Sequence, residues 1–97
     1  MTVIDRIRAA LDAGFAPQDL DIRDDSAEHA GHAGARGGGH YAISIVSDAF
    51  AGKSTVARHR MIYAALDDLM KTQIHALAIR ALTASEASMQ PNQKEPR

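Results

Sequence analysis

A glycine-rich segment near the middle of the chain is the feature that most limits how this sequence can fold. Residues 26–39 read SAEHAGHAGARGGG and contain five of the chain's seven glycines. Glycine loses more backbone freedom on ordering than any other residue, and this segment has no periodic apolar positions whose burial would offset that cost. We therefore expect a long loop that divides the chain into two structured parts. A loop of this length in so small a domain favours a functional role over a slack connector.

The part before this loop predicts one helix and one strand. Apolar residues recur at helical spacing over residues 3–13, Thr2 precedes them as a candidate N-cap, and Gly14 follows as a candidate C-terminal stop. Over residues 19–23, apolar residues alternate with charged ones, as in a half-buried strand. We therefore expect a helix followed by a short strand.

The part after the loop predicts a strand, a helix and a strand. Residues 40–47 place mostly apolar side chains on both faces, which is typical of a central strand. Ser54 or Thr55 can cap a helix over about residues 55–70. The continuously apolar residues 74–82 favour a third strand.

This order predicts an α+β fold in a single domain, because 97 residues with 45% hydrophobic content have room for only one small core. A hairpin and a crossover through the second helix build a three-stranded mixed sheet. Both helices are expected to cover one face, which leaves the other open to solvent or to a partner. The end of the chain is polar and contains two prolines, so we assign residues 1–86 to the domain and residues 87–97 to a disordered tail.

Charge and cysteine content exclude several classes of function. The formal net charge of -1 provides no overall attraction to nucleic acid or to anionic membranes. The first residues lack the pattern of a signal peptide, and no stretch approaches the roughly 20 apolar residues of a membrane span, so we expect a soluble, cytoplasmic protein with no membrane association. The chain has no cysteine, which excludes disulfides, thiol chemistry and an all-cysteine metal site within it.

Two patterns that carry enzyme chemistry in other proteins are incomplete here. Gly52, Lys53 and Ser54 resemble the end of a phosphate-binding loop, but Ser47 stands where that motif requires a glycine. No Ser or Thr nucleophile stands near a recognisable base, and no pair of carboxylates is placed for acid–base work. We expect that the protein is not an enzyme.

The five histidines are the remaining candidates for binding a soft metal: His29, His32, His40, His59 and His75. His29 and His32 lie three residues apart in the loop, a spacing that lets both imidazoles reach one metal ion if the loop folds back. His75 opens the third strand, where its ring could lie near the start of the second strand and the loop. The competing interpretation is that His32, and even more so His40, is an ordinary surface residue. For His75, the competing interpretation is a half-buried strand residue whose ring is hydrogen-bonded to the backbone.

A positive helix start offers a second kind of site. Lys53, Arg58, His59 and Arg60 surround the beginning of the second helix and could meet phosphates if this helix approached a major groove. Acidic residues on the following turns and the overall charge favour an ordinary solvated surface instead.

Two longer motifs carry a resemblance to a known family. Residues 50–63 read FAGKSTVARHRMIY, and residues 74–79 read IHALAI. The earlier part of the pattern is supplied by Asp25, Ser26, His29, His40 and Tyr41. Together these residues strongly resemble the BolA-like family, over nearly the whole chain from the first helix to Glu86. The resemblance implies a fold similar to class II KH domains, with the same order of elements as above.

The resemblance also implies a function. Members of the family associate with monothiol glutaredoxins, and the heterodimer holds a [2Fe-2S] cluster that is also ligated by glutathione, supplied through the glutaredoxin. His75, in the I-H-A-L motif, is the expected ligand, and a second comes from the loop, where position favours His29 and leaves His32 open. A chain without thiolates must borrow sulfur ligands from another molecule, and neutral imidazoles on one iron raise the cluster's potential, as in Rieske centres.

We therefore expect a non-enzymatic adaptor in iron–sulfur trafficking or iron sensing. The family also includes transcriptional regulators of morphology and stress response, so DNA binding through Lys53, Arg58 and Arg60 is the alternative. An RNA-binding KH domain is disfavoured, because the G-x-x-G clamp between helices is not present in the sequence. The sequence leaves open which glutaredoxin is the partner and whether the free chain forms a homodimer.

Overall fold

The computed structural model describes residues 2–25 and 39–89, and it confirms the expected α+β fold. The elements in chain order are α1 (Val3–Phe15), β1 (Asp19–Asp24), β2 (Gly39–Val46), the 3-10 turn η3 (Asp48–Phe50), α2 (Thr55–Ala65), α3 (Asp67–Thr72), β3 (Ile74–Leu82) and α4 (Ala84–Ser88).

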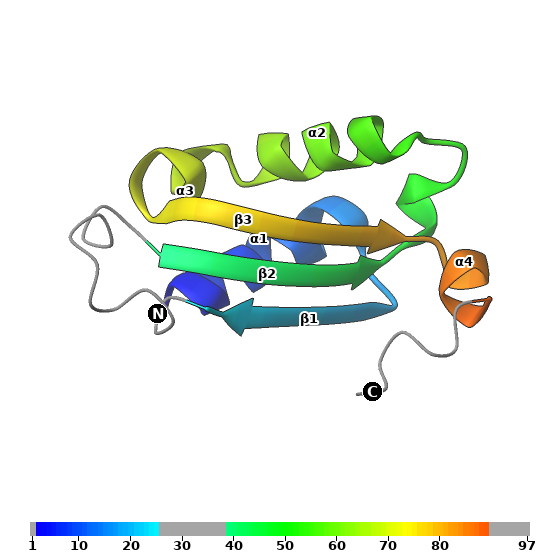
Figure 1. The fold of residues 1–97 in the computed structure, drawn as a ribbon, viewed down its shortest axis with the longest axis horizontal. Helices are drawn as coiled ribbons and strands as arrows, with labels where there is room; N and C mark the ends of the chain where they lie inside the picture. Colours follow the sequence, from blue (N-terminus) through cyan, green and yellow to red (C-terminus); the bar gives the residue numbers. More distant parts are fainter. Residues whose placement is uncertain (1, 26–38, 90–97) are drawn as a thin grey trace.

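The three strands form one mixed sheet in the order β1-β2-β3. β1 pairs with β2 in antiparallel orientation, and β2 pairs with β3 in parallel. Ile43 in the centre of β2 is opposite Ile22 on one side and Ile79 on the other. The parallel pair is joined through α2 and α3, and Figure 1 shows α1 behind the sheet while the front of the sheet carries no helix among the described residues.

The core lies between the sheet and the helices. Along β2, Tyr41, Ile43 and Ile45 are buried, and the residues between them face the other side of the sheet. The buried hydrophobic residues that contact one another form a single cluster: Ile7, Leu11, Phe15, Tyr41, Ile43, Ile45, Phe50, Ile62, Leu66, Leu69, Ile74 and Ala81. One face of the sheet is therefore used for packing. The other face, which no described helix covers, is called the uncovered face below.

The first helix is longer than its sequence pattern predicts. Gly14 continues α1 where it was expected to stop it, and the helix ends at Phe15. Phe15 is buried and packs against Phe50 with ring centroids 5.1 Å apart, which stabilises the two additional helical residues. Ala16 then takes the left-handed conformation (φ 44°) that closes the helix, a role that glycine usually fills.

The second helix is divided, and the prediction of one helix over residues 55–70 is wrong in this respect. Leu66, with φ -101° and ψ 14°, separates α2 from α3. The hydrogen bonds continue across this point, since Leu66 N–H donates to Ile62 O and its own carbonyl accepts from Met70 N–H. Asp67 follows in the first turn of α3, where a carboxylate is favoured.

The ends of the other elements differ little from expectation. β1 runs one residue further, to Asp24, β2 begins and ends one residue earlier, and β3 has the predicted bounds.

The predicted tail begins within a short helix. Thr83 and Glu86 form a capping box that starts α4, so residues 87 and 88 belong to a helix. Residues 90–97 of the predicted tail lie outside the described residues. None of the described helices is long and apolar enough to cross a membrane.

Candidate functional site

His75 is exposed at the beginning of β3, and the ring of His40, at the beginning of β2, lies beside it. The two ring centroids are 5.2 Å apart, with the ring planes tilted by 50°. The register explains this contact, because Gly39 pairs with Ile74 and His40 pairs with Ala76, so that a bulge leaves His75 as the extra residue. Ile74 and Tyr41 point into the core, and the two imidazoles therefore share the uncovered face.

His29 and His32 lie outside the described residues, and their distance from His75 stays a prediction. The two ends of the segment that contains them are nevertheless fixed beside the imidazole pair. Asp25 N–H donates a hydrogen bond of 2.7 Å to His40 O, and Gly39 N–H donates one of 3.0 Å to Gln73 O. The glycine-rich segment therefore leaves and rejoins the fold at the end of the sheet where His40 and His75 lie.

The donor set of this end of the sheet is imidazole. Imidazole nitrogen suits zinc, copper, iron and nickel, whereas carboxylate and carbonyl oxygen suit magnesium and calcium. Within residues 2–25 and 39–89, no three His, Asp or Glu side chains converge to hold a metal ion. The described part of the chain thus offers two imidazoles to a metal centre, and further ligands must come from elsewhere.

His40 is the residue that the sequence interpretation undervalued. The sequence favours an ordinary surface position for it, yet its ring lies next to that of His75, the expected ligand. The signal was present in the sequence, because His40 and His75 each open one of two strands that a right-handed crossover makes parallel neighbours. The bulge that aligns their rings was not visible in the sequence.

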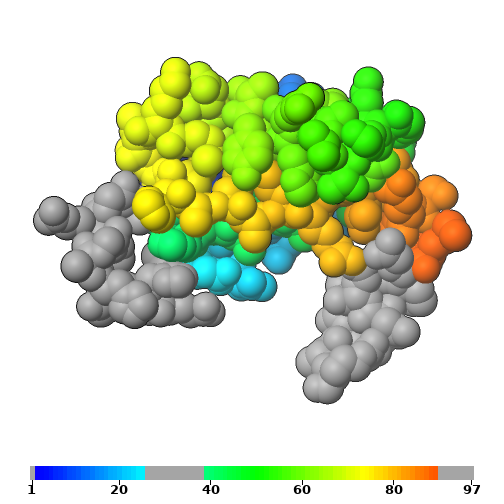
Figure 2. All heavy atoms as spheres, turned by 45° about the horizontal axis from the view of Figure 1, so that its top comes forward, coloured from blue at the N-terminus to red at the C-terminus, as the bar shows by residue number. Residues whose placement is uncertain are grey.

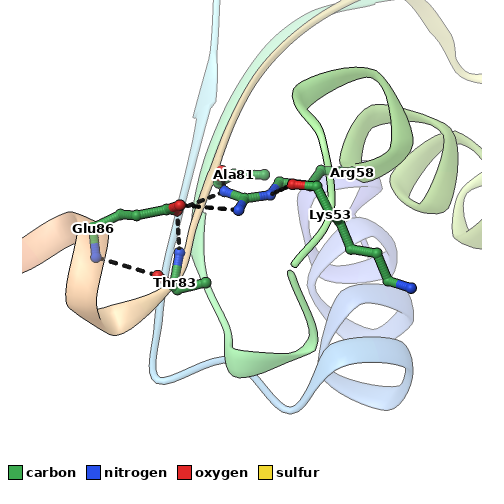
Figure 3. Close-up of polar contacts among 5 residues, drawn as sticks. All are labelled: Lys53, Arg58, Ala81, Thr83 and Glu86. Atoms are coloured by element: carbon green, nitrogen blue, oxygen red, sulfur yellow. Dashed lines mark hydrogen bonds and ion pairs between the residues drawn. The ribbon is translucent and has the colours of Figure 1, made fainter. Parts of the chain in front are cut away.

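Arg58 lies at a second polar cluster, at the start of α2, together with Lys53, Ala81, Thr83 and Glu86 (Figure 3). Its side chain is only 10% exposed and donates hydrogen bonds to Lys53 O and Ala81 O, both at 2.9 Å. It also forms two bonds to the carboxylate of Glu86, at 2.6 and 3.0 Å. The hydrogen bonds from Arg58 are the main cause that lowers the pKa of Glu86 to about 2. The hydrogen bond with Glu86 in turn raises the pKa of Arg58.

The expected contribution of Arg58 to a solvent-facing positive surface is contradicted by this burial. Its guanidinium connects α2 to β3 and α4 instead of pointing outward. Lys53 and Arg60 are exposed, and Figure 2 shows the α2 segment on the outer surface of the molecule. The exposed surface of α2 also carries two large apolar side chains, Val56 and Tyr63.

The uncovered sheet face carries a shallow groove of about 230 Å³. Its lining includes the small side chains of Ala42, Ser44 and Ala78 and the charged side chains of Arg23 and Arg80. His40 precedes these residues on the same face of β2.

Sequence comparison identifies close relatives of this chain. A family model described as BolA-like protein matches residues 11–86. SufE-like protein 1, chloroplastic/mitochondrial, from Arabidopsis thaliana is 47% identical over 87 residues, which cover 84% of this chain. The DNA-binding transcriptional regulator BolA from Escherichia coli is 38% identical over 86 residues, which cover 89% of this chain and 80% of that protein.

Solved structures agree with these relationships. The BolA domain of SufE1 from Arabidopsis thaliana superposes with a TM-score of 0.77 at 45% identity, and the match covers 89% of this chain and 98% of that domain. The chain spans only part of some full-length relatives, with 24% of SufE-like protein 1 and 54% of the chloroplastic protein BOLA1 from the same plant. The matched motifs, the fold and these relatives together establish that the chain belongs to the BolA-like family.

Proposed function

We propose that this chain is a non-enzymatic adaptor that pairs with a monothiol glutaredoxin and shares a [2Fe-2S] cluster with it. His75 supplies one imidazole, and His29 or His32 supplies the other. The single observation that carries the proposal is the position of His75, exposed at the end of the sheet where the segment with the loop histidines leaves and rejoins the fold.

The chemistry of the available donors fits such a cluster. Iron in these clusters accepts imidazole nitrogen as well as thiolate sulfur. The chain has histidines and no cysteine, so it can complete the coordination of one iron but must receive thiolates from a second molecule. The resemblance to the family points to the cysteine of a monothiol glutaredoxin and to glutathione as those sulfur donors. The uncovered sheet face beside His75 provides a surface for that partner.

A reconstitution experiment tests the proposal. The chain is mixed with a monothiol glutaredoxin, glutathione, ferric iron and sulfide, and the visible absorption and circular dichroism spectra of the mixture are recorded. We expect a spectrum that differs from that of the glutaredoxin alone. His75→Ala is expected to abolish the difference, because one iron loses its nitrogen ligand.

The loop ligand and the control are tested in the same mixture. His29→Ala and His32→Ala are compared singly and together, and the variant that removes the spectral difference identifies the second ligand. His59→Ala, on α2, is the matched control and is expected to leave the spectrum unchanged. A spectrum for His75→Ala that matches the unsubstituted chain would defeat the ligand assignment.

DNA binding is a second candidate function, favoured by the name of the Escherichia coli relative and by the exposure of Lys53 and Arg60. Arg58 is left out of this alternative, because its donors are engaged within the fold. If Lys53 and Arg60 contact phosphates, Lys53→Gln and Arg60→Gln should each weaken duplex binding and lower its salt dependence. Binding without sequence preference that vanishes near physiological salt would leave only non-specific attraction.

The location and the assembly of the protein are also part of the proposal. A cytoplasmic location stays a prediction, since two Arabidopsis relatives carry names that place them in the chloroplast or mitochondrion. Self-association of the free chain is likewise a prediction, and sedimentation of the purified chain with and without a glutaredoxin tests both assemblies.

A further inference from the structure

We propose that His40 and His75 form a two-imidazole site that binds a single divalent transition-metal ion in this chain alone, with water completing the coordination. The site lies on the uncovered face of the sheet, at the shared end of β2 and β3. It needs neither a glutaredoxin nor inorganic sulfide, and it includes neither of the loop histidines.

The distance between the rings fits one shared ion. A zinc–imidazole bond is about 2.0–2.1 Å long, so two rings that ligate one ion at a tetrahedral angle hold their centres about 5 Å apart. The centroids of His40 and His75 are 5.2 Å apart. A tilt of 50° between the ring planes excludes face-to-face stacking, in which the nitrogens of the two rings would diverge from a common point.

A main-chain hydrogen bond holds the backbone of His40, and a buried neighbour holds that of His75. His40 O accepts from Asp25 N–H at 2.7 Å, and the next residue of β2 on the core side, Tyr41, is buried. On β3, the neighbouring Ile74 is buried at 4% exposure, which anchors His75 from the preceding position. The two ligands are thus held by paired strands, and binding an ion costs little ordering of the backbone.

The environment suits a cation. Asp25 lies beside His40 through the main-chain hydrogen bond, and Asp24 is opposite Tyr41 in the β1–β2 register. Asp25 is itself paired with Arg23, so the negative potential of this corner is partly compensated. With two imidazoles as the protein ligands, affinity should follow the order cobalt, nickel, copper, with zinc below copper, and magnesium and calcium should bind far more weakly.

This site and the proposed cluster both require His75, so the two occupancies exclude each other. The ion site is nevertheless tested without partner, glutathione or sulfide. Failure of cluster assembly therefore leaves the ion site untouched, and failure of ion binding leaves the cluster proposal untouched.

Titration calorimetry of the purified chain with cobalt, nickel, copper and zinc salts tests the inference. We expect one ion per chain in the affinity order above. His40→Ala and His75→Ala should each weaken binding by at least about tenfold, because even an outer-shell partner of a metal ligand contributes about 10- to 100-fold. His59→Ala, a histidine on α2, is the matched control and should bind as the unsubstituted chain does.

A second measurement needs no variant of the site, and so does not depend on the stability of His40→Ala. Histidine ring resonances are followed by NMR while substoichiometric copper is added. Equal and early broadening of the His40 and His75 signals supports the site. The inference is overturned if His40→Ala binds as tightly as the unsubstituted chain, or if the loop histidines broaden first and His29→Ala/His32→Ala loses ion binding.

Discussion

The guanidinium of Arg58 points inward because the fold supplies an acceptor in each direction in which it donates. A buried cation is costly unless it is paired and fully hydrogen-bonded. Its Nε donates to Lys53 O and its Nη1 donates to Ala81 O. Nη1 and Nη2 together also donate to the two carboxylate oxygens of Glu86. Glu86 also accepts from Thr83 N–H, so that one carboxylate caps α4 and holds Arg58. This ion pair therefore helps to attach the last helix of the described chain to the core.

The first prediction concerns the pH dependence of this ion pair. The pKa of Glu86 is lowered from 4.5 to about 2 in the folded protein, chiefly by its hydrogen bond with Arg58. Its contribution to stability is therefore present above pH 4.5 and is lost as the pH falls toward 2. Glu86→Gln should lower the melting temperature at pH 7, and the difference from the unsubstituted protein should shrink between pH 4.5 and pH 2. Thermal melts followed by circular dichroism measure both.

A surface ion pair provides the control for this measurement. Lys71 and Asp67 are paired at 3.1 Å on α3, with both side chains more than half exposed. Asp67→Asn should change the free energy of unfolding by about 0.5 kcal/mol or less. Equal pH profiles for the Glu86 and Asp67 variants would contradict the role assigned to Glu86.

The second prediction concerns the geometry of the arginine. Arg58→Lys keeps the charge but cannot bond to Lys53 O, Ala81 O and the carboxylate together. Because Ala81 O then lacks its side-chain donor, we expect a loss of about 1–3 kcal/mol in the free energy of unfolding, measured by urea denaturation. Arg60→Lys, on the same helix but exposed, should stay within about 0.5 kcal/mol. Equal losses for the two variants would speak against the role of Arg58 as a buried connector.

Side-chain direction is where the sequence was least informative at the scale of residues. The motif that includes Arg58 and Arg60 shows two cations two positions apart, and only the packing of α2 decides that the first is buried and the second is exposed. The importance of His75 was predictable, because it opens an apolar strand. The proximity of His40 depended on a bulge, which is a property of two paired strands and not of either segment alone.

At the scale of elements, the strand pairing near the imidazoles depends on a glycine. A Cβ atom at Gly39 would lie 2.5–2.8 Å from ring atoms of Tyr41, closer than real contacts allow. The buried Tyr41 ring therefore covers the backbone at the start of β2. A residue with a side chain fits at this position, beside the bulge that aligns His40 with His75, only if the Tyr41 ring moves.

The third prediction follows from this close approach. Gly39→Ala should reduce the free energy of unfolding by about 1–3 kcal/mol, because the overpacked ring must move. The loss should be smaller when the same substitution is made together with Tyr41→Leu, which removes the clashing atoms. A double-mutant cycle by urea denaturation measures the coupling, and strictly additive losses would argue against the contact.

The division between α2 and α3 shows why element boundaries were only partly predictable. Apolar residues continue at helical spacing through Leu66 and Leu69, and both are buried, so periodicity predicts one helix. The chain must nevertheless turn back so that Gln73 O can accept from Gly39 N–H and β3 can begin at the next residue. Tertiary pairing thus decides the conformation of Leu66, whereas strand and helix identity followed from local pattern.

At the scale of the whole molecule, a single buried cluster connects α1, the sheet and the helices α2 and α3. The buried hydrophobic residues of these helices all belong to this one cluster. The fold class and the mixed sheet were predictable from the sequence for the same reason, since few arrangements bury one small set of apolar side chains with these connections.

The fourth prediction tests this unity. Leu11 on α1 is fully buried, and Leu11→Ala should lower the free energy of unfolding by about 2–5 kcal/mol. In a Tyr63→Phe background, which leaves Tyr41 on β2 as the only tyrosine, the transition followed by far-ultraviolet circular dichroism should coincide with that followed by tyrosine fluorescence, with and without Leu11→Ala. A tyrosine transition at lower denaturant than the helical one would show that the sheet and the helices unfold separately.

The placement of β2 in the middle of the sheet has a consequence for biosynthesis. Among the described strands β3 is the last to emerge from the ribosome, so His75 can reach His40 only after β3 has been made and has paired with β2. On a nascent chain that ends before β3, the two imidazoles cannot meet. An ion bound by both would stabilise finished molecules by mass action and would distinguish them from incomplete ones.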